Sequence, residues 1–268
     1  MSIITISRGS FSKGKEVAEK VAENLSYHSV SREVILEASQ DFQIPQNRLD
    51  HAIHDAPSII QRFTFEKQKY IAYVAAEILA HFKGDNVVYH GLAGHFFAKN
   101  ISHLLKVRII ANMEDRIAAL MERDHMGRDE AAAFLKKDDH DRKSWSSQIY
   151  GLDNTDYTLY DLIIHIDKLT IDNAVNIICQ TATMPQFKAT AESQQMIEDL
   201  SLAAKVRALL INDHPTCEVT SVGGAVAIAV QVTRNADAML AGTIESKAYS
   251  VHGVVSATVK MIPAGFFS

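Results

Sequence analysis

The sequence contains little cysteine and no long hydrophobic run. Its two cysteines among 268 residues, Cys179 and Cys217, are too few for a disulfide framework or a zinc site. No apolar run reaches the ~18 residues of a membrane span, and the first residues lack the basic start and apolar core of a secretory signal. We therefore expect a soluble chain with no transmembrane segment, in a reducing compartment such as the cytoplasm.

Positive charge is also not in excess. Lys and Arg number 27 against 32 Asp and Glu, a net charge of −5, so no basic field favours a nucleic-acid partner. Hydrophobic residues make up 47% and charged residues 22% of the chain, which excludes a disordered or collagen-like protein. The length favours one large or two small domains.

Strand-like runs alternate with helical patterns over residues 1–182. Five strands are predicted, at residues 3–7, 27–30, 86–90, 104–111 and 161–167. Helices are predicted at residues 14–25, 58–83, 113–137 and 170–179, the third being broken or bent near Gly127. This alternation predicts an α/β fold with a five-stranded parallel sheet covered by helices on both faces.

The pattern changes after a linker predicted at residues 183–192. The tail, residues 193–268, is predicted to form a helix, two strands joined by Gly223-Gly224, a second helix and a last strand. In the second strand, Val226, Ile228 and Val230 share one face. We expect a small, separable α+β domain with α-β-β-α-β order.

A glycine-bearing loop follows the first predicted strand and precedes a helix. It reads Gly9-Ser10-Phe11-Ser12-Lys13-Gly14-Lys15-Glu16 and satisfies the pattern G-x-x-x-x-G-K. Backbone N–H groups of such a loop curl around phosphates at a helix N-terminus, and its lysine reaches the β- and γ-phosphates. The pattern predicts a phosphate-binding loop rather than an ordinary strand–helix turn.

Glu16 stands where that pattern has a Ser or Thr that holds Mg²⁺. Its carboxylate suits the first turn of a helix, which is a purely structural role. It is also a candidate Mg²⁺ ligand, because magnesium prefers hard oxygen ligands. Alternatively it opposes the phosphates by charge repulsion, which would weaken nucleotide binding.

Cations gather in the predicted helix at 113–137 and just beyond it. They are Arg116, Arg123, Arg128, Lys136, Lys137, Arg142 and Lys143, interleaved with Asp and Glu. One interpretation is a mobile arginine-bearing lid that stabilises charge during phosphoryl transfer. The other is a solvated helix with surface salt bridges.

Two further places could hold the acceptor of a phosphoryl group. Arg32, directly after the second strand, and Arg62 could pair with a phosphate or carboxylate, although a surface ion pair is an equal alternative. His90 and His95 flank a glycine-bearing turn starting at Gly91, at the carboxyl end of a strand, where α/β sheets place their sites.

Several of these segments together resemble the cytidylate kinase-like family. They are Ile4–Glu16, Ser31–Ile35, Tyr89–Gly94 and Tyr160–Ile164. The resemblance covers residues 1–180 and implies a P-loop nucleoside monophosphate kinase fold that uses ATP and Mg²⁺. It implies that Gly9–Lys15 holds the ATP phosphates, that Arg32 lies in the acceptor region, and that Arg123 and Arg142 lie on the lid side.

The tail resembles a BON domain over residues 201–263. The resemblance rests on its element order, on Gly223-Gly224 and on the segment Val251–Val255 before the last strand. It implies an intracellular sensing or assembly module, through which a homo-oligomer or a protein partner would form.

Two functional hypotheses follow. The first is an enzyme that transfers the γ-phosphoryl group of ATP to a nucleoside monophosphate with a CMP-like acceptor. The second is a catalytically weak nucleotide-binding protein that signals through its BON-like domain. Glu16 separates them, because a competent kinase needs a metal ligand in place of the missing hydroxyl.

Overall fold

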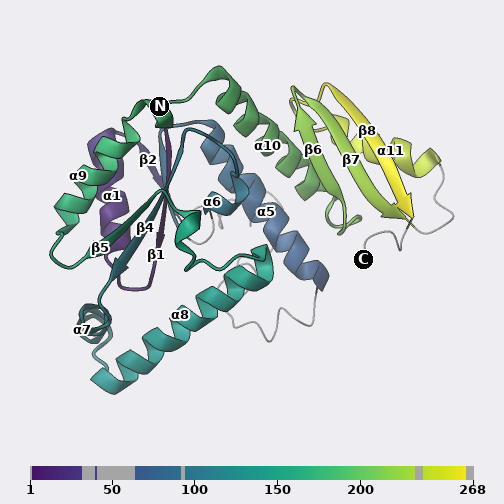
Figure 1. Ribbon diagram of the computed structural model, residues 1–268. Helices are drawn as coiled ribbons and strands as arrows, with labels where there is room; N and C mark the ends of the chain where they lie inside the picture. The colour runs from purple at the N-terminus through teal and green to yellow at the C-terminus, as the bar shows by residue number, and fades with distance from the viewer. Residues whose placement is uncertain (1, 32–39, 41–63, 92–93, 233–237, 264–268) are drawn as a thin grey trace. The chain divides into compact units, whose positions relative to one another are not determined.

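The computed structural model describes residues 2–31, 40, 64–91, 94–232 and 238–263 (Figure 1). They form two compact units. The first comprises the described residues up to Ser31 and from Gly84 to Thr190. The second comprises α5 (Thr64–Lys83) and the described residues from Ala191 onward. The division near residue 190 falls within the predicted linker. Residues 64–83 were predicted to belong to the first domain, whereas they pack in the second unit.

A five-stranded parallel sheet forms the centre of the first unit, in the order β2-β3-β1-β4-β5. Its strands are β1 (Ile3–Arg8), β2 (His28–Val30), β3 (Val87–His90), β4 (Leu104–Ala111) and β5 (Leu162–Ile166). The central strand β1 pairs with β3 on one side and with β4 on the other. The sheet and its flanking helices confirm the predicted α/β fold.

Two helices, α1 (Gly14–Leu25) and α9 (Ile171–Ala182), pack against each other along the sheet (Figure 1). In α1, Val17, Ala18 and Val21 recur at helical spacing and are fully buried with the sheet's apolar side chains. Thr170 and Asn173 form a reciprocal capping box that fixes the start of α9. A rigid core therefore lies directly behind the loop between β1 and α1.

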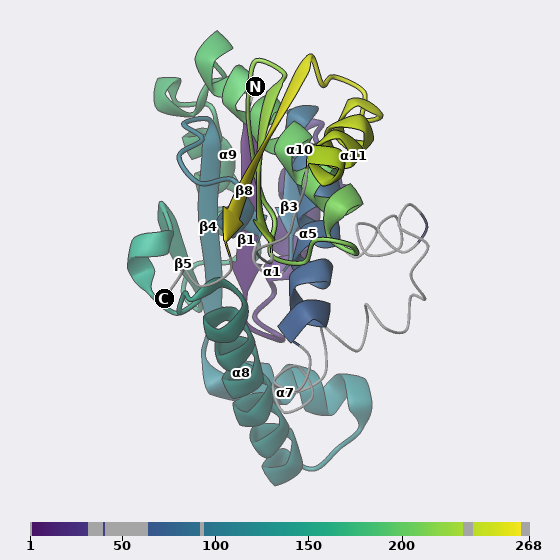
Figure 2. The ribbon, with the colours of Figure 1, turned by 90° about the vertical axis from the view of Figure 1, so that its right-hand side faces the viewer.

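The predicted break near Gly127 is present. After β3 and the short α6 (Gly94–Phe97), β4 leads into α7 (Met113–Asp124), followed by α8 (Arg128–Tyr150). His125 caps α7 in a left-handed conformation, and the two helices then run in different directions (Figure 2). A small apolar cluster of Ile117, Leu120, Ala131 and Leu135 joins them. Helix α8 extends to Tyr150, beyond the predicted end at residue 137.

The tail of the second unit has the predicted α-β-β-α-β order. Its elements are α10 (Ala191–Leu210), β6 (Glu218–Val222), β7 (Ala225–Val232), α11 (Ala238–Tyr249) and β8 (Ser256–Pro263). The strands form a sheet in the order β6-β7-β8, beside which α10 and α11 lie (Figure 2). Val226, Ile228 and Val230 are buried, as their alternation predicts.

Helix α5 packs against α10 within the second unit. Arg207 Nη2 donates to Gln68 Oε1 at 2.9 Å, and Gln194 Nε2 donates to the Lys83 carbonyl oxygen at 3.0 Å. A segment from the middle of the chain therefore shares packing with the tail. Across the described ranges, no helix is both long and apolar enough to cross a bilayer.

Candidate functional site

The loop between β1 and α1 lies at the carboxyl end of the central strand. Phe11 and Lys13 adopt left-handed backbone conformations, with φ of 59° and 64°. Residues other than glycine rarely adopt the left-handed region, because it strains their backbone. Such a strained conformation persists only where the surrounding structure holds it. The loop conformation therefore depends on its tertiary contacts.

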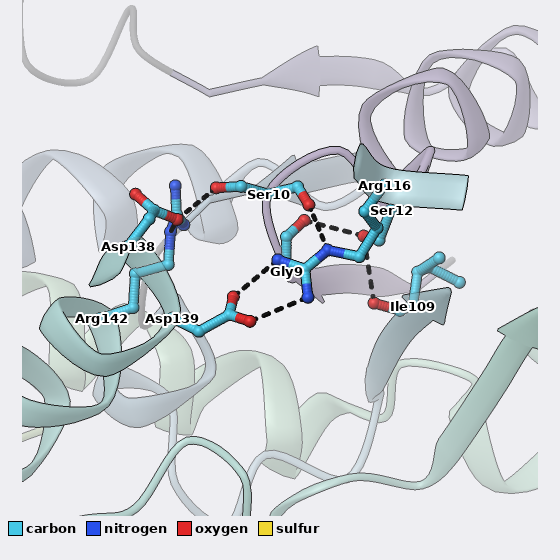
Figure 3. Close-up of polar contacts among 8 residues, drawn as sticks. All are labelled: Gly9, Ser10, Ser12, Ile109, Arg116, Asp138, Asp139 and Arg142. Carbon is cyan, nitrogen blue, oxygen red and sulfur yellow. Dashed lines mark hydrogen bonds and ion pairs between the residues drawn. The ribbon is translucent and has the colours of Figure 1, made fainter. Parts of the chain in front are cut away.

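Ser12 is one of these contacts (Figure 3). Its hydroxyl oxygen lies 2.8 Å from the Gly9 carbonyl oxygen and 3.3 Å from that of Ile109 on β4, and the side chain is buried. Because a hydroxyl has one proton, it donates to one carbonyl at a time. Ser12 thus ties the middle of the loop to its start at Gly9 and to β4 at Ile109.

The two glycines of the loop meet different surroundings. A Cβ at Gly14 would lie 2.6 Å from Arg8 Cβ, so this position accepts no side chain without a shift of the backbone. A Cβ at Gly9 would lie 3.6 Å from the guanidinium carbon of Arg116, an ordinary contact distance. Gly14 is therefore required by the close approach of Arg8.

The amino terminus of α1 opens onto the loop without a side-chain cap. Its N-cap residue is Lys13, which forms no capping hydrogen bond. The first N–H groups of a helix have no partner within the helix, and the helix dipole adds partial positive charge there. An anion such as a phosphate would satisfy these groups.

Lys15 and Glu16 both turn to partners one helical turn further along α1. Lys15 Nζ lies 3.6 Å from Glu19 Oε1, and Glu16 Oε1 lies 3.6 Å from Lys20 Nζ. Both pairs are about half exposed, so each contributes little to stability. The Lys15 ammonium can leave Glu19 for a phosphate at small energetic cost.

Arg116 on α7 makes the most buried charged contact with the loop (Figure 3). Its Nε donates to the Ser10 carbonyl oxygen at 2.7 Å, and its two terminal nitrogens donate to Asp139 at 2.8 and 2.7 Å. Arg116 belongs to the cation-rich segment but was not among the predicted site residues. Its position in the first helical turn after a predicted strand is the signal that could have marked it as a site residue.

Arg142 and Arg123, the two predicted lid cations, occupy different positions. Arg142 Nε donates to Asp138 Oδ2 at 2.7 Å, and the Ser10 hydroxyl donates to the same oxygen at 2.5 Å. Arg142 is thus linked to the loop through Asp138. The exposed Arg123 pairs with its neighbour Asp124 and lies 4.6 Å above the Phe11 ring.

The predicted acceptor residues are only partly within the described structure. Arg32 and Arg62 lie outside the described residues. His90 is buried at the end of β3, and Gly91 follows it. A Cβ at Gly91 would lie 2.7 Å from the Tyr89 hydroxyl oxygen, so a larger residue there would require the buried Tyr89 side chain to shift.

His95, on α6, is a buried histidine near this edge of the sheet. Burial, and secondarily the charges of Lys106 and Arg108, lower its pKa to about 3, so it is neutral at physiological pH. Its ring centroid lies 5.1 Å from that of Tyr160, and its Nε2 has no hydrogen-bond partner among the described residues.

A polar network that the sequence analysis missed joins the ends of β1 and β4. Tyr160 Oη lies 3.2 Å from Ser7 Oγ and 2.8 Å from the Asn154 carbonyl oxygen. Arg108 donates to the same carbonyl and to Tyr160 Oη. The network positions the start of the phosphate loop.

The carboxylates near the loop bear on whether it could hold Mg²⁺. No group of three or more His, Cys, Asp or Glu in the described ranges could hold a metal. Mg²⁺ in nucleotide sites usually takes one or two carboxylates together with substrate phosphates. Two carboxylates could supply such a ligand: Asp138, which lies beside the Ser10 hydroxyl and pairs with Arg142, and Glu16, which pairs with Lys20.

The five-stranded parallel sheet with a phosphate-binding type of loop after β1 fits the P-loop kinase fold. The chain belongs to the cytidylate kinase-like family, which matches residues 3–168. It is 29% identical over 89 residues to a cytidylate kinase of Staphylothermus marinus, spanning 32% of this chain and 50% of that protein. It is 28% identical over 94 residues to a cytidylate kinase of Sulfolobus acidocaldarius, spanning 35% and 51%. The chain thus spans about half the length of these curated relatives.

Solved structures with similar backbones include two bacterial proteins. An uncharacterized protein from Eubacterium ventriosum matches with a TM-score of 0.48 and 20% identity, over 68% of this chain and 98% of the other. A shikimate kinase from Bacteroides thetaiotaomicron matches with a TM-score of 0.42 and 12% identity, over 68% and 99%.

Proposed function

We propose that this protein transfers the γ-phosphoryl group of ATP to a nucleoside monophosphate, with CMP or a close analogue as acceptor. The observation that carries the proposal is the uncapped amino terminus of α1 behind the Gly9–Lys15 loop, in a chain of the cytidylate kinase-like family. The curated relatives named cytidylate kinase support the choice of acceptor.

In this proposal the loop binds the phosphates of ATP, and the arginines stabilise the transferred group. Amides at the start of α1 bind the phosphates, and Lys15 exchanges Glu19 for a phosphate oxygen. Arg142 and Arg123 stabilise the charge that develops on the transferred group. Mg²⁺, bound with the triphosphate, would neutralise phosphate charge, and Asp138 and Glu16 are its candidate ligands.

The acceptor is proposed to bind at the carboxyl end of β3. His90 and Gly91 lie there, and Arg32 and Arg62 are proposed to hold the acceptor phosphate. The neutral, buried His95 near this edge of the sheet suits the uncharged base of the acceptor.

A second candidate function is nucleotide binding with little turnover, read out by the BON-like tail or by a partner bound to it. The observation that favours it is the charge around the loop. Glu16 replaces the usual hydroxyl, and Lys15, Arg116 and Arg142 are each paired with a carboxylate. The observed α-β-β-α-β order of the tail is compatible with a signalling module.

A coupled assay for nucleoside diphosphate formation distinguishes the two functions. The parent and Glu16→Thr would be assayed with ATP and each common nucleoside monophosphate across a magnesium series. Glu23→Thr, an exposed glutamate later in α1, is the matched control. If the protein is a kinase, the parent forms CDP from CMP, and Glu16→Thr preserves or raises the rate because a hydroxyl replaces a negative charge.

Three other results carry different conclusions. Negligible transfer to every acceptor contradicts the kinase and favours the regulatory function. Turnover with another monophosphate but not CMP corrects the acceptor. Parental turnover that is lost in Glu16→Thr but kept in Glu23→Thr makes Glu16 a metal ligand or a catalytic carboxylate.

A further inference from the structure

The phosphate loop is contacted by carboxylates from its own chain. Asp138 and Asp139 are adjacent on α8, more than a hundred residues after the loop. Asp138 accepts a hydrogen bond from the Ser10 hydroxyl at 2.5 Å, and Asp139 accepts two from Arg116. Figure 3 shows both carboxylates approaching from the α8 side, with Arg116 between Asp139 and the loop.

These contacts use groups that would otherwise attract a phosphate. A carboxylate and a phosphate oxygen make the same charge-assisted hydrogen bonds to a guanidinium, often in a bidentate arrangement. Arg116 holds Asp139 in this bidentate way while its Nε is used by the Ser10 carbonyl oxygen. The two carboxylates therefore satisfy the Ser10 hydroxyl and the Arg116 guanidinium as an anionic ligand would.

The amides of α1 are not satisfied in the same way. The side chain of the N-cap residue Lys13 makes no capping hydrogen bond, so the loop keeps a backbone anion site beside arginines that are already paired with carboxylates. A polyphosphate that enters this site finds the Arg116 guanidinium already bound to Asp139 and the Ser10 hydroxyl already bound to Asp138, so it must compete with both carboxylates for these donors. Arg116 and the Ser10 hydroxyl cannot make these hydrogen bonds to the carboxylates and to a phosphate at the same time.

The exposure of the two partners indicates which one can leave. The Arg116 side chain is 9% exposed and Asp139 is 38% exposed, so the carboxylate is on the solvent side of the pair. Asp138 also has a second partner, Arg142, one turn along the same helix. It can leave Ser10 while its charge stays balanced.

We propose that Asp138 and Asp139 form an intramolecular competitor of phosphate, which holds α8 against the loop until a polyphosphate ligand displaces it. This inference rests on the proposed function in that the ligand is a phosphate, but it does not require turnover. It predicts that the parent binds polyphosphate more weakly than its loop allows, because each binding event must first release the two carboxylates.

The test measures binding of inorganic tripolyphosphate to the full chain by calorimetry at fixed ionic strength. The variants are D138N, D139N and the double variant, which remove charge with little change in shape. We expect the double variant to bind at least ~10-fold more tightly than the parent, with each single variant between them. The single variants keep the test decisive if the double variant does not fold.

Glu114→Gln is the matched control. Glu114 pairs with Arg128 between α7 and α8, and both side chains are exposed. Its replacement removes one negative charge from the same pair of helices, so its affinity for tripolyphosphate should stay within about twofold of the parental value. A gain equal to that of D138N or D139N would mean that net charge alone is responsible, and would overturn the proposal.

The remaining outcomes separate this inference from the kinase. Equal or weaker binding by D138N and D139N overturns the inference and makes Asp139 a residue that positions Arg116. Tighter binding by the variants, without nucleoside diphosphate formation by any of the proteins, supports the inference and contradicts the kinase. Absence of tripolyphosphate binding in every protein overturns both.

Discussion

Two glycine-bearing turns, one in each unit, are built in opposite ways. In the β6–β7 turn, positive φ angles fall on glycines, 57° at Gly223 and 84° at Gly224. In the phosphate loop they fall on Phe11 and Lys13. The first turn follows from its local sequence, whereas the second keeps an unfavourable backbone because Ser12, Arg116 and Asp138 hold it. Strain stored in this way is typical of binding sites.

The largest effect is expected at the tail turn, from Gly224→Ala. Its Cβ would lie 2.8 Å from Val255 Cγ2 and 2.9 Å from the Gly253 carbonyl oxygen, at a φ that alanine disfavours. We expect the second unit to lose about 2–3 kcal/mol of stability, measured by hydrogen exchange in β6–β8. Gly242→Ala, in α11 with no atom near its Cβ, should instead be neutral or stabilising. Equal losses in both variants would contradict this explanation.

In the loop between β1 and α1, Gly14→Ala and Gly9→Ala should differ in their effect on stability. The 2.6 Å approach to Arg8 Cβ predicts a loss of about 1–3 kcal/mol for Gly14→Ala, whereas the 3.6 Å contact at Gly9 predicts a small change. Urea unfolding followed by the fluorescence of the single tryptophan, Trp145 on α8, measures both. Similar stabilities would show that Arg8 does not restrict the loop.

Acid should destabilise the first unit through His95. Its pKa is about 3 when folded and near 6.5 when unfolded, so the unfolded chain binds the extra proton between these values. Stability is therefore full above pH 6.5 and falls by up to about 1.4 kcal/mol per pH unit below it. His95→Gln should flatten this dependence, and His165→Gln, at an exposed strand position, is the control. An unchanged acid slope in His95→Gln would contradict a neutral buried histidine.

The smallest effect is expected from Lys13→Gly, which removes a side chain from a left-handed position. Relief of strain should stabilise the first unit by less than ~1 kcal/mol, because glycine also gains entropy in the unfolded chain. Thermal unfolding measures the change in stability. The reference is Lys188→Gly, at an exposed position before α10. A loss of stability at Lys13 would show that the lysine side chain itself supports the loop.

Periodicity predicted the sheet, the helices and the order of the tail well, because these depend on which residues are apolar and how they are spaced. The break near Gly127 and the turn at Gly223-Gly224 also followed from local signals. The contacts of Arg116 with Asp139 and of Ser10 with Asp138 did not, because they join residues far apart in sequence. A segment of alternating charge gives no sign of which arginine becomes buried.

The packing of α5 against α10 could not be predicted either, because the two helices are far apart in the sequence and no local pattern indicates which helix packs against which. For the candidate site, the motif selected the loop residues Gly9–Glu16, and their role in binding phosphate stays a prediction. The pair of Lys15 with Glu19 follows the ordinary i,i+4 rule and could have been anticipated.

The central claim is that the Gly9–Lys15 loop binds the phosphates of a nucleotide, and the most direct measurement is calorimetry of ATP binding with Mg²⁺. We predict that Lys15→Ala lowers affinity at least ~10-fold, because it removes a point charge from the phosphates, without changing the melting temperature. Lys188→Ala should bind ATP like the parent. Equal affinity for ATP in Lys15→Ala, Lys188→Ala and the parent would contradict the claim.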